Sequence, residues 1–583
     1  MGKQVLEKRR RLGRLVTIPG VTCAGLCEVL RRLRQAPIEE EVSAHEAKAA
    51  AKMEYDREMS CSLELPLRDG GSFEWRIART PARSVQRLVE VSPALKRMFA
   101  AAPITPARPW NVILAHDEVT PGAVLRPHNR RKFVAFYISF LEFKHALRHD
   151  CCWFPLGVIR SAQVEKIRGG LSGTIKSLLR RLLLEDGNLV DGVALPLQGG
   201  PTMFFAKFAA HLGDEVALSR GLGVKGSAGI RPCLKCANVL KKGSGIAGAG
   251  AAPNRLVEIT CRDRSAFIGN SDEAVWGAHD ELTHLQGTIS KAAFVRHEKA
   301  HGINFNPDGL LADADLRGQA RENASKEHWR SSASELLCIY PLVRHFACIV
   351  ILPNFDELRD EVASLCHCFA VIDKIQRAKA GDIDASALGA AVDRHADAHE
   401  KAYGADNWKP KFHLATHIPE QVEKFDVVLD CFVVERSHLL PKMILDNQDI
   451  LKGFEKAAIS RVLLARLQEL ESFDERPGLR GGDAELSPLL AEAVGGDVVL
   501  SSSAAFKGLR VWAGDVVRMQ NNFLCVAALG QRGGDLFILG HECVVIEKRT
   551  PNASVLRKDG ELLLAWWSGE SVEMCHAWSE LAS

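Results

Sequence analysis

Five apolar segments lie between residues 110 and 212, and they constrain the fold more than any other feature of the sequence. They are rich in β-branched and aromatic side chains, which favour strands. Strand character is predicted for residues 110–117, 133–143, 152–159, 192–197 and 202–212. Residues 163–184, between the third and fourth segments, instead show helical periodicity and a basic face. This region is therefore expected to combine strands with a helix.

The composition is that of an ordinary globular protein. The chain has 583 residues, of which 46% are hydrophobic and 25% are charged, and this excludes a disordered, collagen-like or coiled-coil chain. No apolar run approaches the roughly 20 residues of a membrane-spanning helix. The basic N-terminus lacks the apolar region of a secretory signal. We therefore expect a soluble intracellular protein with reduced cysteines and no membrane partner.

The chain outside the α/β region divides by pattern. Residues 1–100 combine predicted helices with two strands at 60–67 and 72–77, joined by a turn of hairpin type. Residues 270–405 are mostly helical in pattern, and 472–500 are rich in glycine and acidic residues, as in a linker. Residues 501–583 predict a small β-barrel-like domain. Its short strands are expected at 515–519, 523–528, 535–539, 542–547 and 561–567.

Three carboxylates stand in apolar surroundings. Asp117 ends the strand 110–117, Asp214 follows the strand 202–212, and Glu435 lies within an apolar run. A carboxylate in such a setting is costly unless it is paired or binds a metal. Asp117 also fits a turn, Asp214 a helix N-cap, and Glu435 an ion pair with Arg436. Taken together, the three acids favour two-metal phosphoryl transfer with Mg²⁺ or Mn²⁺.

A known family shows a similar order of motifs. Along the chain the Asp117 strand is followed by Gly213-Asp214-Glu215, by a run that ends in Cys233-Leu234-Lys235-Cys236, by His413-Leu414-Ala415-Thr416-His417, and by Val434-Glu435-Arg436. This order resembles the eukaryotic cut-and-paste DDE transposases of the CACTA and Kyakuja–Dileera–Zisupton kind. Because each motif is short, the resemblance depends on their order and spacing.

The resemblance implies a fold and a catalytic site. The fold would be an RNase H-like core, and Asp117, Asp214 and Glu435 would be catalytic residues that hold two Mg²⁺ or Mn²⁺ ions. The long interval between Asp214 and Glu435 requires an inserted helical domain. The core would then comprise residues 101–235 and 406–471, with the insertion at 236–405. The partners would be transposon-end and target DNA, bound by a nuclear homo-oligomer.

Two departures leave other functions open. The family's Asp-x-x-His within the insertion has its nearest counterpart in Lys326-Glu327-His328-Trp329, and no DNA-binding zinc finger precedes the catalytic region. The alternatives are an RNase H-like nuclease without strand transfer, and a catalytically inactive, transposase-derived protein that binds DNA or protein.

The pair Cys233 and Cys236 has the spacing of tetrahedral Zn²⁺ ligands. A complete site needs two further ligands. His413 and His417 are candidates because residues four apart on a helix share a face. Cys261 and His284 compete with them. Such a site would be structural, since thiolates do not suit Mg²⁺ chemistry.

Basic residues cluster after the Asp117 strand. Arg126, Arg130, Arg131 and Lys132 lie on the connection to the next strand. They fit either a solvated surface or a series of contacts to DNA phosphates. Residues 8–11, with the sequence Lys-Arg-Arg-Arg, fit a nuclear-import signal or a DNA-contacting tail.

Overall fold

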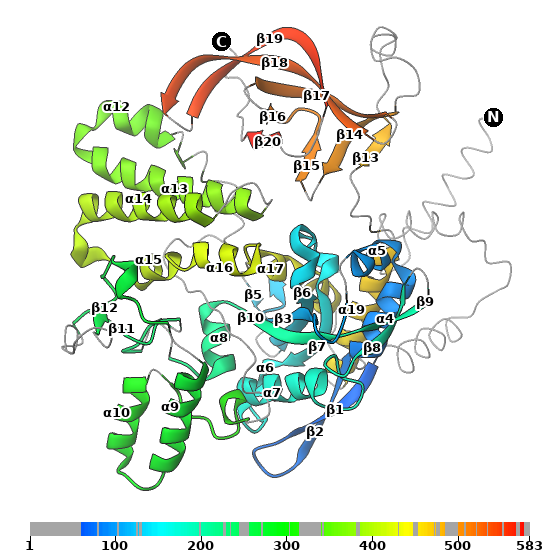
Figure 1. Cartoon of the computed structure of the whole chain (residues 1–583), viewed down its shortest axis with the longest axis vertical. Helices are drawn as coiled ribbons and strands as arrows, with labels where there is room; N and C mark the ends of the chain where they lie inside the picture. The colour runs from blue at the N-terminus through cyan, green and yellow to red at the C-terminus, as the bar shows by residue number, and fades with distance from the viewer. Residues whose placement is uncertain are drawn as a thin grey trace, which may run out of the picture. The chain divides into compact units, whose positions relative to one another are not determined.

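The structure is a computed structural model (Figure 1). It describes residues 60–313, 340–483 and 499–575 apart from short gaps within these ranges, of which 244–255 is the longest. The basic segment 8–11 and the Lys326–Trp329 motif lie outside the described residues. The described chain is mixed α/β, with a central sheet, several groups of helices and a C-terminal sheet. No described helix is both long and apolar enough to cross a membrane.

Six strands form the central sheet in the order β1-β2-β7-β6-β3-β10. Their bounds are β1 Ser60–Pro66, β2 Ser72–Ala78, β3 Trp110–Val119, β6 Phe133–Phe140, β7 Phe154–Arg160 and β10 Ala206–Leu212. All neighbouring strands pair antiparallel except β10, which pairs parallel with β3. The predicted hairpin at 60–77 thus extends the central sheet through the contact of β2 with β7.

Burial explains why these segments form strands. All eight residues of β6 are buried. Its side chains are therefore buried on both faces of the sheet, which explains its apolar sequence. At one end of the sheet, Phe99, Trp110, Phe140 and Phe204 pack with ring centroids 4.9–5.8 Å apart. These contacts anchor the start of β3, which carries Asp117 further along.

Two strand boundaries differ from the sequence prediction. The predicted strand 202–212 is split at Phe205, because β9 (Gly200–Phe204) pairs with β8 (Val193–Leu197) and only β10 joins the central sheet. The Phe205 carbonyl meanwhile accepts a hydrogen bond from the Trp110 amide. In addition, β3 continues to Val119, so Asp117 lies inside the strand and not at its end.

Helices complete the core around the sheet. Two helices precede β3, α4 (Pro81–Val91) and α5 (Pro93–Ala100). In the chain, α7 (Gly170–Leu183) comes before the β8–β9 pair and β10, and α8 (Glu215–Leu222) comes after β10. The last helix of the core, α19 (Phe454–Glu471), packs against β2 and β7. Ser92 caps α5 by accepting a hydrogen bond from Leu95. The Arg160 guanidinium of β7 contacts the Glu455 carboxylate of α19 at 2.7 Å, and both side chains are largely buried.

The described residues between 270 and 405 are mostly helical, as predicted. They include α9 (Asp272–Leu285), α10 (Lys291–His301), α13 (Arg359–Lys379) and α14 (Ala385–Tyr403). Two short helices follow, α15 (Pro410–Ala415) and α16 (Ile418–Phe425). The described strands between β10 and Glu435, β11 (Val239–Leu240) and β12 (Val257–Glu258), pair with each other and not with the central sheet.

The C-terminal residues form a separate eight-stranded sheet, curved as a half-barrel. Its strands are β13 Gly478–Asp483, β14 Val499–Phe506, β15 Leu509–Trp512, β16 Val516–Met519, β17 Asn522–Arg532, β18 Asp535–Thr550, β19 Ala553–Trp566 and β20 Val572–Cys575. The predicted strands 535–539 and 542–547 are one continuous strand, β18. Part of the predicted linker, Gly478–Asp483, is a strand of this sheet.

Candidate functional site

Asp117 lies in β3, and Asp214 lies two residues beyond the end of β10, the strand that pairs parallel with β3. Ala115 of β3 pairs with Leu212 of β10, and each aspartate comes two residues later. The Asp117 side chain is 28% exposed. Asp214 is half-buried and is the N-cap of α8, where its carboxylate accepts a hydrogen bond from the Ala217 amide at 2.7 Å. The N-cap, which the sequence left open as an alternative role for Asp214, is therefore confirmed. Asp117, Asp214 and Glu435 are not among the groups of described residues whose ligand atoms all lie within 4.8 Å of one another.

Glu435 lies on α17 (Phe432–Ser437), a short helix attached to this part of the sheet. The Tyr137 hydroxyl of β6 donates a hydrogen bond to the Ser437 carbonyl at 3.2 Å. His438 Nδ1 is 4.0 Å from Asp117 Oδ2. Burial lowers the pKa of His438 to about 3, so this is a contact between a neutral imidazole and a carboxylate.

The surroundings of Glu435 differ from those that the sequence predicts. Glu435 is exposed, although it lies in an apolar run, because that run is a helix with one solvent-facing side. Arg436 does not pair with it. Instead, the Arg436 guanidinium contacts Asp150 at 3.1 Å and donates to the Arg148 carbonyl. The Glu435 carboxylate is thus open to solvent beside the strand that carries Asp117.

Cationic groups surround the neighbouring carboxylate Glu118. Lys132 Nζ lies 2.6 Å from Glu118, Arg220 lies 3.6 Å from it, and the Ser161 hydroxyl donates to it at 2.6 Å. Burial opposes the charge of Glu118, but these partners outweigh burial and hold its pKa below the usual value. Glu118 therefore stays ionised and fixes Lys132 and Arg220 beside β3.

A polar pocket of about 500 Å³ lies next to this cluster. Its lining includes Arg68, Arg168 and Arg220, together with Asn304, Asn306 and Asp308. Arg168 pairs with Asp308 at 2.8 Å, so three arginines face one acid in the lining. Anionic ligands such as phosphate groups suit this balance of charge. No local sequence pattern predicts this pocket, because its arginines come from distant segments.

The predicted DNA-contacting residues have different environments. Arg131 is only 6% exposed and donates to the Leu445 carbonyl at 3.1 Å, so it joins two segments of the core and is not available as a surface contact to DNA. Lys132 is held by Glu118. Arg126 lies in β5 (Arg126–Pro127), but its side chain is outside the described residues, as is the whole of Arg130.

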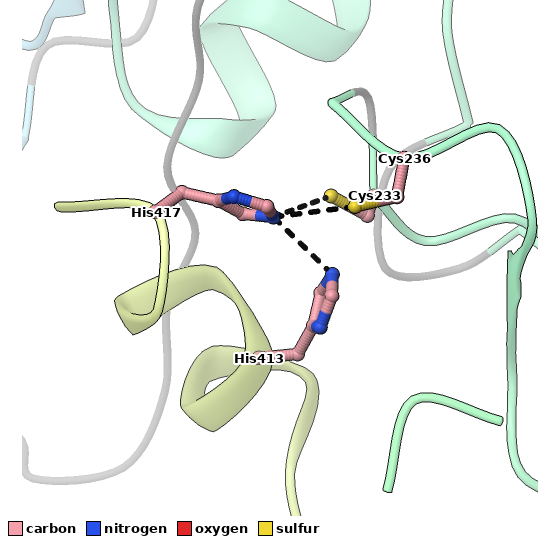
Figure 2. Close-up of side chains that lie close together, drawn as sticks. All are labelled: Cys233, Cys236, His413 and His417. Atoms are coloured by element: carbon pink, nitrogen blue, oxygen red, sulfur yellow. Dashed lines mark hydrogen bonds between the residues drawn. The ribbon is translucent and has the colours of Figure 1, made fainter. Parts of the chain in front are cut away.

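Four side chains that the sequence analysis considered as zinc ligands come together in one buried group. Cys233, Cys236, His413 and His417 each offer a ligand atom, and these atoms all lie within 4.8 Å of one another. Figure 2 shows the cysteines on one loop and the histidines on another segment, with dashed lines from His417 to both sulfurs and to His413. His417 Nε2 is 3.4 Å from each sulfur and 3.4 Å from His413 Nε2.

The local structure explains how these ligands converge. Val239, Val257 and Ile259 form a small apolar core with the two cysteines. His413 lies on α15 and packs edge-on against Phe267. His417 is the N-cap of α16, so the histidines belong to consecutive short helices and not to one helical face. The competing candidates lie elsewhere: Cys261 is at the margin of the apolar core, and His284 bonds to Asp280 of its own helix.

Contacts within this group favour the thiolate form of Cys233, which is the form that binds a metal. A hydrogen bond from Cys236, with others from His413 and His417, lowers the pKa of Cys233. Burial disfavours the His417 imidazolium, but Cys233 and Glu420 raise the pKa of His417 to about 9. The Glu420 carboxylate contacts His417 Nδ1 at 2.9 Å. In metal sites, the ring nitrogen that does not bind the metal is commonly paired with a carboxylate in this way. The sequence analysis did not identify Glu420 in this role.

A second group of possible metal ligands was also missed. Glu281 of α9 approaches His297 and His301 of α10, and their ligand atoms lie within 4.8 Å of one another. The signal was present in the sequence, because residues 297–301 read His-Glu-Lys-Ala-His, which matches the His-Glu-x-x-His pattern of zinc sites on helices. Glu281 could not have been assigned as the third ligand without the packing of the two helices.

Comparison with known proteins adds no assignment to these sites. No protein-family model matches the chain, and no curated protein matches it either.

Proposed function

We propose that this chain is a DDE transposase-like polynucleotidyl transferase with an RNase H-like core. The observation that carries the proposal is the position of Asp117 in β3 and of Asp214 just beyond the parallel strand β10, each two residues after the paired residues Ala115 and Leu212. The chain passes from β3 through the antiparallel strands β6 and β7 and the helix α7 before it returns to β10. This connectivity supports an RNase H-like arrangement, as the motif order does.

In the proposed site, Asp117, Asp214 and Glu435 hold two Mg²⁺ or Mn²⁺ ions. The ions would activate the attacking oxygen and stabilise the leaving oxygen during strand cleavage and transfer. The contacts of Tyr137 and His438 support Glu435 as the third ligand, since they hold α17 beside β3. The exposure of Glu435 and the partial exposure of Asp117 would let a DNA strand approach.

DNA is the proposed substrate. The pocket lined by Arg68, Arg168 and Arg220 supports this assignment, because Arg220 belongs to α8, the helix that Asp214 caps, and also lies 3.6 Å from Glu118. A phosphate in this pocket would lie close to the acidic edge. The proposal also implies a nuclear protein that acts as a homo-oligomer.

Cys233, Cys236, His413 and His417 are the proposed ligands of a structural Zn²⁺. A tetrahedral zinc ion separates a ligand nitrogen from another nitrogen or a sulfur by roughly 3.3–3.6 Å, given its bond lengths. The measured separations from His417 are all 3.4 Å. The ion would join the loop after α8 to the segment that leads to α17, and so help to position Glu435.

The test is divalent-metal-dependent nicking of DNA by the wild type and by Asp214→Asn. Asparagine caps helices as well as aspartate does, so this substitution removes the charge and preserves α8. We expect nicking with Mn²⁺ by the wild type, and its loss in the variant with an unchanged melting temperature. Asp186→Asn, at an exposed aspartate, is the matched control. Undiminished nicking by Asp214→Asn would contradict the proposal.

A catalytically inactive DNA-binding protein is the second candidate, and the arginine pocket favours it independently of the acids. In that case the wild type would bind DNA without nicking it under any divalent ion. Arg168→Gln and Arg220→Gln would then weaken binding and reduce its dependence on salt, because each removes one phosphate contact.

A further inference from the structure

The hairpin of α9 and α10 carries a cluster of metal-ligating side chains that the proposed function does not use. The two helices run side by side (Figure 1). An apolar core that includes Val275 and Leu282 of α9 and Phe294 of α10 holds them together. Phe305, which follows α10, packs against Phe294 with ring centroids 5.5 Å apart. The relative position of the helices is therefore set by packing and does not depend on a metal.

This packing brings one carboxylate between two imidazoles. His297 and His301 are four residues apart on α10, so they share a face. Glu281 Oε1 lies 3.5 Å from His297 Nδ1 and 3.2 Å from His301 Nε2. These separations exceed the roughly 2.7–2.9 Å of a charge-assisted hydrogen bond. They match the roughly 3.3 Å edge of a tetrahedron with metal–ligand bonds of about 2.0–2.1 Å.

The chemistry of these three donors selects a class of ion. Two imidazoles and one carboxylate suit Zn²⁺, Co²⁺, Ni²⁺ or Cu²⁺, whereas Mg²⁺ and Ca²⁺ prefer oxygen ligands throughout. The side chains of His297 and Glu281 are 44% and 49% exposed, and that of His301 is 23% exposed. An ion can thus enter from solvent, and its fourth position remains open to water.

We propose that Glu281, His297 and His301 form a binding site for a divalent transition-metal ion of the zinc type. The remaining acid of the His-Glu-x-x-His pattern, Glu298, has a different partner. Its carboxylate accepts a hydrogen bond from the Phe305 amide at 2.9 Å, and its carbonyl accepts one from Ile303 at 3.1 Å. In zinc peptidases the corresponding Glu acts as a general base. Here it holds the chain that leaves α10.

The proposed role of the site is therefore to hold the end of α10 in place, and not to catalyse hydrolysis. Asn304, Phe305, Asn306 and Asp308 line the arginine pocket, and they follow His301 directly in the chain. The Asn304 amide also donates to the Gly223 carbonyl at 2.7 Å, which joins this segment to the end of α8. An ion that fixes the end of α10 should accordingly order residues 303–308 and one wall of the pocket.

The experiment measures metal binding directly and does not depend on transposase activity. The full-length chain, loaded with one equivalent of zinc to fill the cysteine site alone, is titrated with Co²⁺ and followed by absorption spectroscopy and calorimetry. Co²⁺ should not displace zinc from the cysteine site, because Zn²⁺ binds such ligands more tightly. We expect one further ion per chain, with visible d–d bands and without the near-ultraviolet charge-transfer band of a cobalt–thiolate bond.

Variants decide which side chains bind the ion. His301→Asn and Glu281→Gln should each weaken Co²⁺ binding by about ten-fold or more. His284→Asn, at an exposed histidine on α9, should bind as the wild type does. Circular dichroism checks that each variant is folded. Failure of the wild type to bind a further ion, or unchanged affinity in His301→Asn or Glu281→Gln, would overturn the site.

Hydrogen exchange tests whether the bound ion orders residues 303–308. Peptides that cover residues 303–308 should exchange more slowly when Co²⁺ or Zn²⁺ is bound, and this protection should be absent in His301→Asn. Binding without any change in the exchange of this segment would overturn the coupling to the pocket.

Discussion

His438 Nδ1 of the segment after α17 lies 4.0 Å from Asp117 Oδ2 of β3. This contact joins two parts of the chain that are more than 300 residues apart in sequence. It lies at the end of the short helix that carries Glu435, where that helix packs against β3. Because burial disfavours the charged form of His438, this contact is not an ion pair.

Glu435→Gln should abolish metal-dependent nicking and leave the fold intact. The side chain is exposed, so the free energy of unfolding should change by no more than about 0.5 kcal/mol. Nicking should fall by several orders of magnitude, because a bound metal ion contributes several kcal/mol to the transition state. Rates and thermal melts are compared with Glu423→Gln, an exposed glutamate on α16. Wild-type nicking by Glu435→Gln would remove this residue from the site.

Cys233→Ser should remove zinc from the purified protein and destabilise the residues around β11, α15 and α16. The physical reason is that structural zinc contributes directly to the free energy of folding. Elemental analysis and protease sensitivity measure the two effects. Cys261→Ser is the matched control, since Cys261 contacts the same apolar core without belonging to the four-residue group. Zinc retained by Cys233→Ser, or absent from the wild type, would refute the assignment.

The buried pair Arg160–Glu455 should matter far more than an exposed pair. Glu455→Ala leaves an uncompensated guanidinium against α19 and should cost about 3–5 kcal/mol of unfolding free energy. Asp360→Ala breaks an exposed pair with Lys401 and should cost less than about 1 kcal/mol. Denaturant unfolding measures both. Equal costs would show that the Arg160–Glu455 contact does not secure α19 to the sheet.

His395 should make the protein less stable in mild acid. Burial, followed by the nearby His399, lowers the pKa of His395 to about 4, whereas an unfolded histidine has a pKa near 6.5. The unfolded chain thus binds more protons between these values, and the free energy of unfolding falls as pH decreases from about 6.5 to 4. His395→Gln should reduce this fall. The difference between variant and wild type should stay constant above pH 7.5, and an unchanged pH profile would contradict the prediction.

Local features of the sequence determined much of the secondary structure. The apolar residues of β3 and β6, the N-cap at Asp214 and the spacing of Cys233 and Cys236 are all readable within a few residues, because strand propensity, capping and chelation depend on neighbours in the chain. The division into a mixed α/β region, helices and a C-terminal sheet follows from the same patterns.

The tertiary structure alone decided which distant side chains meet. His417 reaches Cys233 across 184 residues, Glu281 reaches α10 only through helix packing, and Arg131 is buried against Leu445 although its sequence context indicates a basic surface. Such contacts depend on how apolar faces pack, and each face is compatible with many partners. The sequence therefore predicted the ligand types and their local geometry, whereas packing selected the groups that can act together.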